Sequence, residues 1–93
     1  MFIVVLKLEL YIPTSNSLKH KRMILNSLKS RLRNNFNVSV AEVNGHDKWQ
    51  RATIAIANVV SEKRYIHKTM EKLLNFVEQF NGVDLLRHEM EIL

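Results

Sequence analysis

Cationic side chains recur between residues 19 and 33 at spacings of three and four, with Asn26 completing the series. The series consists of Lys19, Arg22, Lys29 and Arg33, and Lys21 and Arg31 flank it. Residues three and four apart lie on one face of an α-helix, so the spacing predicts one basic stripe. Ammonium and guanidinium groups in a row are suited to contact the successive phosphates of a nucleic acid.

The charge of the chain is distributed unevenly. No acidic residue occurs from Leu10 to Ala41. Residues 1–41 carry seven Lys/Arg and one acid, whereas residues 42–93 carry seven and eight, which together give the formal +5 of the chain. The predicted stripe thus lacks the Glu partners that stabilise an ordinary solvated helix, and its first cations lie where the helix dipole disfavours them. A bound anion would relieve both penalties; a solvated face and an acidic protein partner are the alternatives.

A second candidate site follows in the turn before the third predicted strand. It comprises His46, Lys48, Trp49 and Arg51. An aromatic ring and a guanidinium beside a turn could stack on an unpaired base or anchor a partner. The alternative, slightly favoured for the tryptophan, is a ring folded over the sheet edge, with Asp47 capping the turn and pairing with Arg51.

The sequence lacks the residue patterns that metal binding, cofactor binding and catalysis require. The 93-residue chain has no cysteine, and its four histidines are scattered without helical i, i+4 pairing, so we expect neither a metal site nor a cofactor. No nucleophile is arranged with a base, which argues against an enzyme. His88 shares a face with Leu86 and Met90 and is expected to be partly buried. No apolar run approaches the ~20 residues of a membrane span, and the lack of cysteine fits the cytoplasm.

The periodicity of the apolar residues predicts the elements that must position these sites. They are strands at residues 2–12, 38–43, 50–60 and 84–92, and helices at residues 18–35 and 62–80. Ser15, Asn16 or Ser17 would cap the first helix and Ser61 the second, and a bulge is expected at Ala41–Glu42. The order β-α-β-β-α-β is typical of a ferredoxin-like α+β sandwich, an antiparallel sheet of order 4-1-3-2 with two helices on one face, formed by a single domain over residues 1–93.

The face of the sheet away from the helices would carry small and apolar side chains. They are Ile3, Val5, Thr53, Ala55 and Ala57. Such a face suits homodimerisation, although an ordinary exposed sheet remains an alternative. Glu9, Glu89 and Glu91 would share this face with Lys7 and Arg87, and cross-strand ion pairing explains them more simply than catalysis does. An RNA-recognition motif stacks bases on aromatic residues in the middle of its first and third strands, whereas here only Tyr11, near a strand end, could stack, so the sequence argues against that mode of binding.

Three segments carry a resemblance to a known family. Ser17–Arg22 resembles Ser-Leu-Lys-x-Lys-Arg, Asn37–Glu42 resembles Asn-Val-Ser-Val-Ala-Glu, and Asp47–Ala52 resembles Asp-x-Trp-Gln-Arg-Ala, the motifs of the YlxP-like family, a bacterial domain of unknown function. His20 stands where that family commonly has an acid. The resemblance implies a ferredoxin-like fold, a cytosolic protein, and a gene neighbourhood with ribosome-binding factor A and initiation factor two; it implies no catalytic residue.

Charge and resemblance together predict a partner class. We expect a small RNA-binding or ribosome-associated protein that uses its first helix to contact RNA or a ribosomal particle. The alternative is a homodimeric interaction module that docks on an acidic protein and has no role with nucleic acid.

Overall fold

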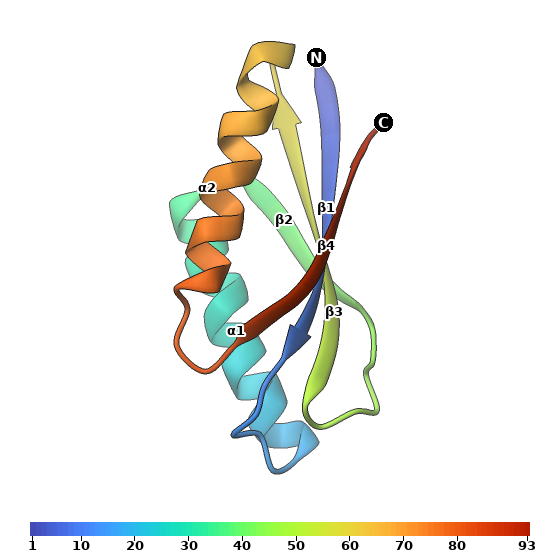
Figure 1. Ribbon diagram of the computed structural model, residues 1–93, viewed down its shortest axis with the longest axis vertical. Helices are drawn as coiled ribbons and strands as arrows, with labels where there is room; N and C mark the ends of the chain where they lie inside the picture. The colour runs from blue at the N-terminus through green and yellow to red at the C-terminus, as the bar shows by residue number, and fades with distance from the viewer.

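The computed structural model describes residues 1–93 and has the element order expected from the sequence (Figure 1). The strands are β1 (Phe2–Tyr11), β2 (Val38–Asn44), β3 (Arg51–Val60) and β4 (Asp84–Ile92). The helices are α1 (Leu18–Asn35) and α2 (Ile66–Glu78), and a 3-10 turn, η1 (Lys63–Tyr65), leads into α2. The prediction of a ferredoxin-like α+β sandwich is confirmed.

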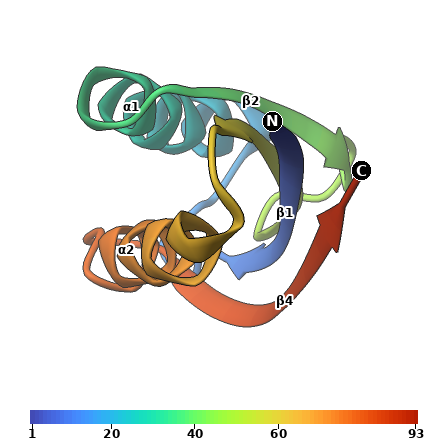
Figure 2. The same ribbon diagram turned by 90° about the horizontal axis from the view of Figure 1, so that it is seen from above.

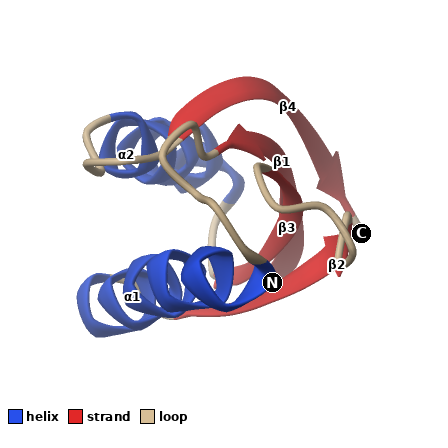
Figure 3. Cartoon of the chain, turned by 90° about the horizontal axis from the view of Figure 1, so that it is seen from below, coloured by secondary structure: helices blue, strands red, loops and turns tan.

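The four strands form one antiparallel sheet in the order β2-β3-β1-β4, which is the predicted order. Both helices cover the same face of this curved sheet, as Figures 2 and 3 show from opposite directions. Strands β2 and β4 form the two edges, and α1 lies along the β2 side. The other face of the sheet is open.

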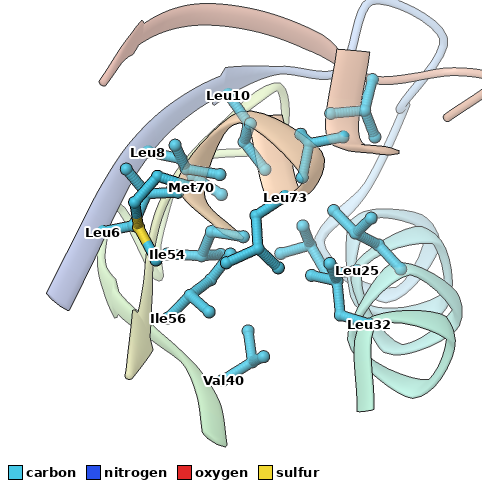
Figure 4. Close-up of a cluster of buried hydrophobic side chains, with 14 of the residues drawn as sticks. Leu6, Leu8, Leu10, Leu25, Leu32, Val40, Ile54, Ile56, Met70 and Leu73 are labelled. Atoms are coloured by element: carbon cyan, nitrogen blue, oxygen red, sulfur yellow. The ribbon is translucent and has the colours of Figure 1, made fainter. Parts of the chain in front are cut away.

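The core lies between the two helices and the sheet (Figure 4). Alternate residues of β1, from Val4 to Leu10, are buried and point toward the helices, as a period of two requires, and Ile12 just after the strand is also buried. Leu25, Leu28 and Leu32 of α1 and the stripe from Ile66 to Val77 of α2 close this core. Each fully buried aliphatic side chain contributes about 1.5–3 kcal/mol before the loss of conformational entropy.

Helix boundaries depend on capping. Ser17 caps α1 as predicted, since its hydroxyl accepts a hydrogen bond from the backbone N–H of His20 at 3.0 Å. The prediction for the second helix was wrong at its start: α2 begins at Ile66, after η1, and Ser61 does not cap it. Neither helix is both long enough and apolar enough to cross a membrane.

Two further expectations need correction. The bulge between β2 and β3 falls between Glu42 and Asn44, so it lies one or two residues later than predicted. His88 is exposed on β4, because the neighbouring helix leaves this half of the edge strand uncovered. The polar–apolar alternation of β4 therefore reports which face a residue takes, and not whether that face is covered.

Candidate functional site

Lys21 is the member of the predicted basic set that the structure places inside the protein. Its side chain is 1% exposed and continues the buried stripe of α1 with Leu25, Leu28 and Leu32. Position 21 is four residues before Leu25, so helical geometry puts it on the core face. Lys21 is therefore removed from the set of possible phosphate contacts.

All three N–H donors of the Lys21 ammonium are used. The Nζ atom donates to Glu42 Oε2 at 2.9 Å, to the backbone O of Gly45 at 2.8 Å and to the backbone O of Arg51 at 3.2 Å. The two carbonyls belong to opposite sides of the loop that joins β2 to β3. Lys21 thus fixes the base of this loop against the first turn of α1.

The other cations of α1 lie at the surface. Lys19, Arg22, Arg31 and Arg33 are exposed and Lys29 is half-buried, and none of the five has an ion-pair partner. Lys19, Arg22, Lys29 and Arg33 follow one side of the helix by their spacing, and we call these four the basic stripe. The guanidinium of Arg33 donates to the backbone O of Val40 at 2.9 Å, so this stripe borders the edge strand β2.

Arg31 does not belong to the basic stripe. Its guanidinium carbon lies 5.6 Å from the ring centroid of Phe80, in the segment that follows α2. The cation–π contact directs Arg31 to the opposite side of α1, toward α2. A ligand on the basic stripe would therefore meet four cations of this helix.

The loop between β2 and β3, residues 45–50, presents the second predicted site. Trp49 is 58% exposed, so the expectation that its ring folds over the sheet edge was wrong. Asp47 makes no ion pair with Arg51, and its carboxylate does not cap the turn. His46 Nε2 lies 3.2 Å from the backbone O of Glu42, while Lys48 and Arg51 are exposed.

Gln50 connects this loop to the loop that precedes α1. Its side-chain amide donates to the backbone O of Pro13 at 3.1 Å and of Ser15 at 3.3 Å, and its own backbone O accepts from Ile12 at 2.8 Å. The two loops and the start of α1 consequently lie together at one end of the molecule, the lower end in Figure 1. The two predicted sites therefore meet, because the basic stripe begins at the end that carries Trp49.

A polar row that the sequence did not single out lies on the open face near this end. The register pairs Asn44 with Thr53 and Thr53 with Glu9, so an amide, a hydroxyl and a carboxylate stand side by side on β2, β3 and β1. A pocket of about 100 Å³ lies over them, and Lys48 and Arg51 also line it. Strand pairing brings these three residues together, and no local sequence motif predicts it.

The centre of the open face holds the predicted cross-strand ion pairs. Arg87 donates to Glu89 at 2.6 Å, and its Nε lies 3.9 Å from Glu9, while Lys7 lies 3.9 Å from Glu89. The hydrogen bond from Arg87, aided by the charge of Lys7, lowers the pKa of Glu89 below its ordinary value. No three His, Asp or Glu side chains of the chain are grouped so that they could hold a metal ion.

Comparison with known proteins agrees with the three motifs. The family model described as "Protein of unknown function (DUF503)" matches residues 3–90. The uncharacterised protein YlxP of Bacillus subtilis (strain 168) is 36% identical over 76 residues, which cover 82% of this chain and 83% of that protein. With nearly its whole length matched, the chain belongs to the DUF503 family, to which the YlxP-like resemblance pointed.

Proposed function

We propose that this protein is an RNA-binding domain that acts on structured RNA or a ribosomal particle and is not an enzyme. The basic stripe would contact the phosphates, and the loop with Trp49 would contact unpaired bases at its end. The observation that carries the proposal is that unpaired surface cations and an exposed tryptophan share one end of the molecule.

The clustering of cations without carboxylate partners supports this proposal. Lys7, Arg64 and Arg87 each lie within 4.0 Å of a carboxylate, whereas the four cations of the basic stripe, like Lys68 and Lys72 of α2, do not. The basic stripe differs from those two lysines in that four such cations follow one side of one helix. Uncompensated like charges on one helix destabilise it, and phosphates would remove that repulsion. The helix is about 27 Å long at 1.5 Å per residue, enough for several phosphates of one strand.

The exposed ring of Trp49 supports the proposed contact between its loop and unpaired bases. A solvent-exposed indole contributes little to folding, but stacking on a base is worth about 1–3 kcal/mol per base. Gln50 and Lys21 hold the loop on both sides of this ring through the hydrogen bonds described above, so the ring is presented on an anchored loop. An anchored aromatic residue loses less conformational entropy when it binds.

The test is binding to ribosomal RNA fragments as a function of salt. We expect log K to fall linearly with log salt concentration, with a slope of roughly −0.7 to −0.9 for each phosphate contacted. The double variant Arg22→Glu/Lys29→Glu should abolish binding because it reverses the middle of the basic stripe. Affinity that survives this change, or that is undetectable at low salt, would contradict the proposal.

A matched control comes from the second helix. Lys68 and Lys72 are exposed, unpaired and four residues apart on α2. The variant Lys68→Glu/Lys72→Glu changes the net charge by the same amount at another surface. It should retain most of the affinity if the position of the charge matters, and lose as much as the first variant if only total charge matters.

One observation favours the second candidate, a homodimeric module for an acidic protein partner. Ile3 and Val59 are cross-strand neighbours on the open face and are 39% and 55% exposed. Val59→Glu would disrupt a dimer formed through this face, which analytical ultracentrifugation measures. A protein partner that stays bound after nuclease treatment would support this candidate, and its loss would exclude it.

A further inference from the structure

The pocket over the polar row has a combination of groups that the basic stripe lacks. Glu9, Thr53 and Asn44 offer a carboxylate, a hydroxyl and an amide on three adjacent strands, and Lys48 and Arg51 add two cations from the loop side. The stripe would attract any polyanion, because it presents only positive charge. The pocket presents acceptors and donors together, which is what the edge of a base requires.

Apart from the long ion pair between Glu9 and Arg87, these groups are free to bind a ligand. No hydrogen bond within the protein is made by the Glu9 carboxylate, the Thr53 hydroxyl, or the charged groups of Lys48 and Arg51. The nearest cation to Glu9 is Arg87 Nε at 3.9 Å, which is beyond hydrogen-bond distance. Asn44 Oδ1 accepts from the backbone N of Gly45 at 2.8 Å, which leaves its amino group available.

The backbone is irregular on both sides of the pocket. The register of β1 with β4 shifts between Glu9 and Leu10, and that of β2 with β3 shifts between Glu42 and Asn44. Bulges redirect side chains and occur often beside functional sites. Here the two shifts adjoin the two ends of the same polar row, at Glu9 and at Asn44.

We propose that this pocket receives the Watson–Crick edge of one unpaired guanine. At neutral pH a glutamate carboxylate accepts hydrogen bonds and donates none. Guanine presents two adjacent donors on that edge, N1–H and N2–H, which match the two oxygens of Glu9. Adenine and cytosine present one donor beside an acceptor, and uracil presents one donor between two acceptors, so each leaves the carboxylate facing an acceptor.

The remaining groups fit the rest of such a nucleotide. Lys and Arg are common partners of guanine O6 and N7, which places Lys48 or Arg51 at those acceptors or at a flanking phosphate. Tyr11 does not line the pocket, but it lies opposite the lining residue Arg51 in the register, on the same face. The pocket volume of about 100 Å³ is well below the ~300 Å³ of typical small-molecule sites, so it admits part of one base only.

This inference rests on the proposed function in one respect, that the guanine belongs to an RNA strand. A free guanosine nucleotide presents the same chemical groups, so the test distinguishes these two sources. The first arm of the test titrates the intact protein with GMP, AMP, CMP and UMP and follows the backbone amide signals of Thr53 and Gly45 by NMR. The second arm measures affinity for pentanucleotide RNAs that carry guanosine, adenosine or cytidine between uridines.

We expect the protein to bind the guanine ligand more tightly than the other bases in both arms. Glu9→Gln should reduce this ratio of affinities by roughly tenfold or more, which is the scale of one lost bidentate pair. Glu91→Gln is the matched control, because it makes the same change on the open face outside the pocket, at a carboxylate that forms no ion pair with Arg87. The double variant Arg22→Glu/Lys29→Glu should lose its affinity for the pentanucleotide RNAs and retain its affinity for GMP. Thermal unfolding of each variant verifies that it folds.

The outcomes separate the two proposals. Equal RNA affinity for every central base, or a guanine preference that Glu9→Gln leaves intact, overturns the guanine pocket while RNA binding stands. Selective binding of GMP by a protein that binds neither the pentanucleotides nor ribosomal RNA fragments at low salt supports the pocket, assigns it to a free nucleotide, and overturns the proposed function. No binding in either arm overturns the guanine pocket, and the titration with ribosomal RNA fragments decides the proposed function separately.

Discussion

The Lys21 ammonium lies 2.9 Å from the Glu42 carboxylate, in a site where the lysine is 1% exposed. This contact joins the first turn of α1 to β2, and the two carbonyls that Lys21 also binds join both to the loop of residues 45–50. The three segments that carry the family resemblance therefore converge on one buried ammonium group. A buried charge of this kind is tolerated only when its partners are present.

Lys21→Met is accordingly expected to destabilise the protein severely. The variant leaves Glu42 without its cation and the backbone carbonyls of Gly45 and Arg51 without their donor, and breaking a buried pair from one side costs about 3–5 kcal/mol. Urea unfolding followed by circular dichroism measures the loss. Lys19→Met is the control on the same helix, and at its exposed position we expect a change within about 0.5 kcal/mol. Equal effects for the two variants would refute the structural role of Lys21.

Gly45 occupies a position in the same loop that other residues would strain. Its φ is +80°, and an added Cβ would lie 3.3 Å from the backbone O of Arg51, one of the Lys21 acceptors. Gly82 has a similar φ of +91° with nothing within 4 Å of such a Cβ. Gly45→Ala should therefore cost more than Gly82→Ala, for which the conformational term alone is about 1–2 kcal/mol. A smaller effect at Gly45 in thermal unfolding would contradict this view of the loop.

Much of this architecture follows from the sequence, because the period of two in β1 and the helical stripes define both the elements and their buried faces. The burial of Lys21 also follows from the sequence, since its position four residues before Leu25 places it on the core face of the helix. A lysine is seldom buried, so the residue type predicts a surface position for Lys21. Glu42, the partner that permits its burial, lies on another element, and the helical pattern alone does not reveal it. The polar row of Glu9, Thr53 and Asn44 depends on strand register and on bulges, which no local pattern specifies.

The ion pair between Arg87 and Glu89 gives a pH prediction. The hydrogen bond from Arg87 lowers the pKa of Glu89 in the folded state, so the pair stabilises the fold above the ordinary carboxyl pKa. This contribution disappears as the pH falls through the lowered pKa. Since both side chains are well exposed, we expect a small effect on stability but a clear one in an NMR titration of the Glu89 carboxyl carbon. Arg87→Gln should raise that pKa, and high salt should raise it partway; an unchanged titration in the variant would refute the assigned cause.

Trp49 is the only tryptophan of the chain, so its fluorescence reports on one site. Because the ring is 58% exposed, its emission should resemble that of indole in water and should be quenched readily by iodide. RNA stacked on the ring should protect it from iodide, while Trp49→Phe should keep part of the RNA affinity and Trp49→Ala should lose about 1–3 kcal/mol of it. Neither substitution should change the free energy of unfolding by more than about 0.5 kcal/mol. If both variants bind RNA as the natural chain does, the loop takes no part in recognition, and binding would be due to the basic stripe alone.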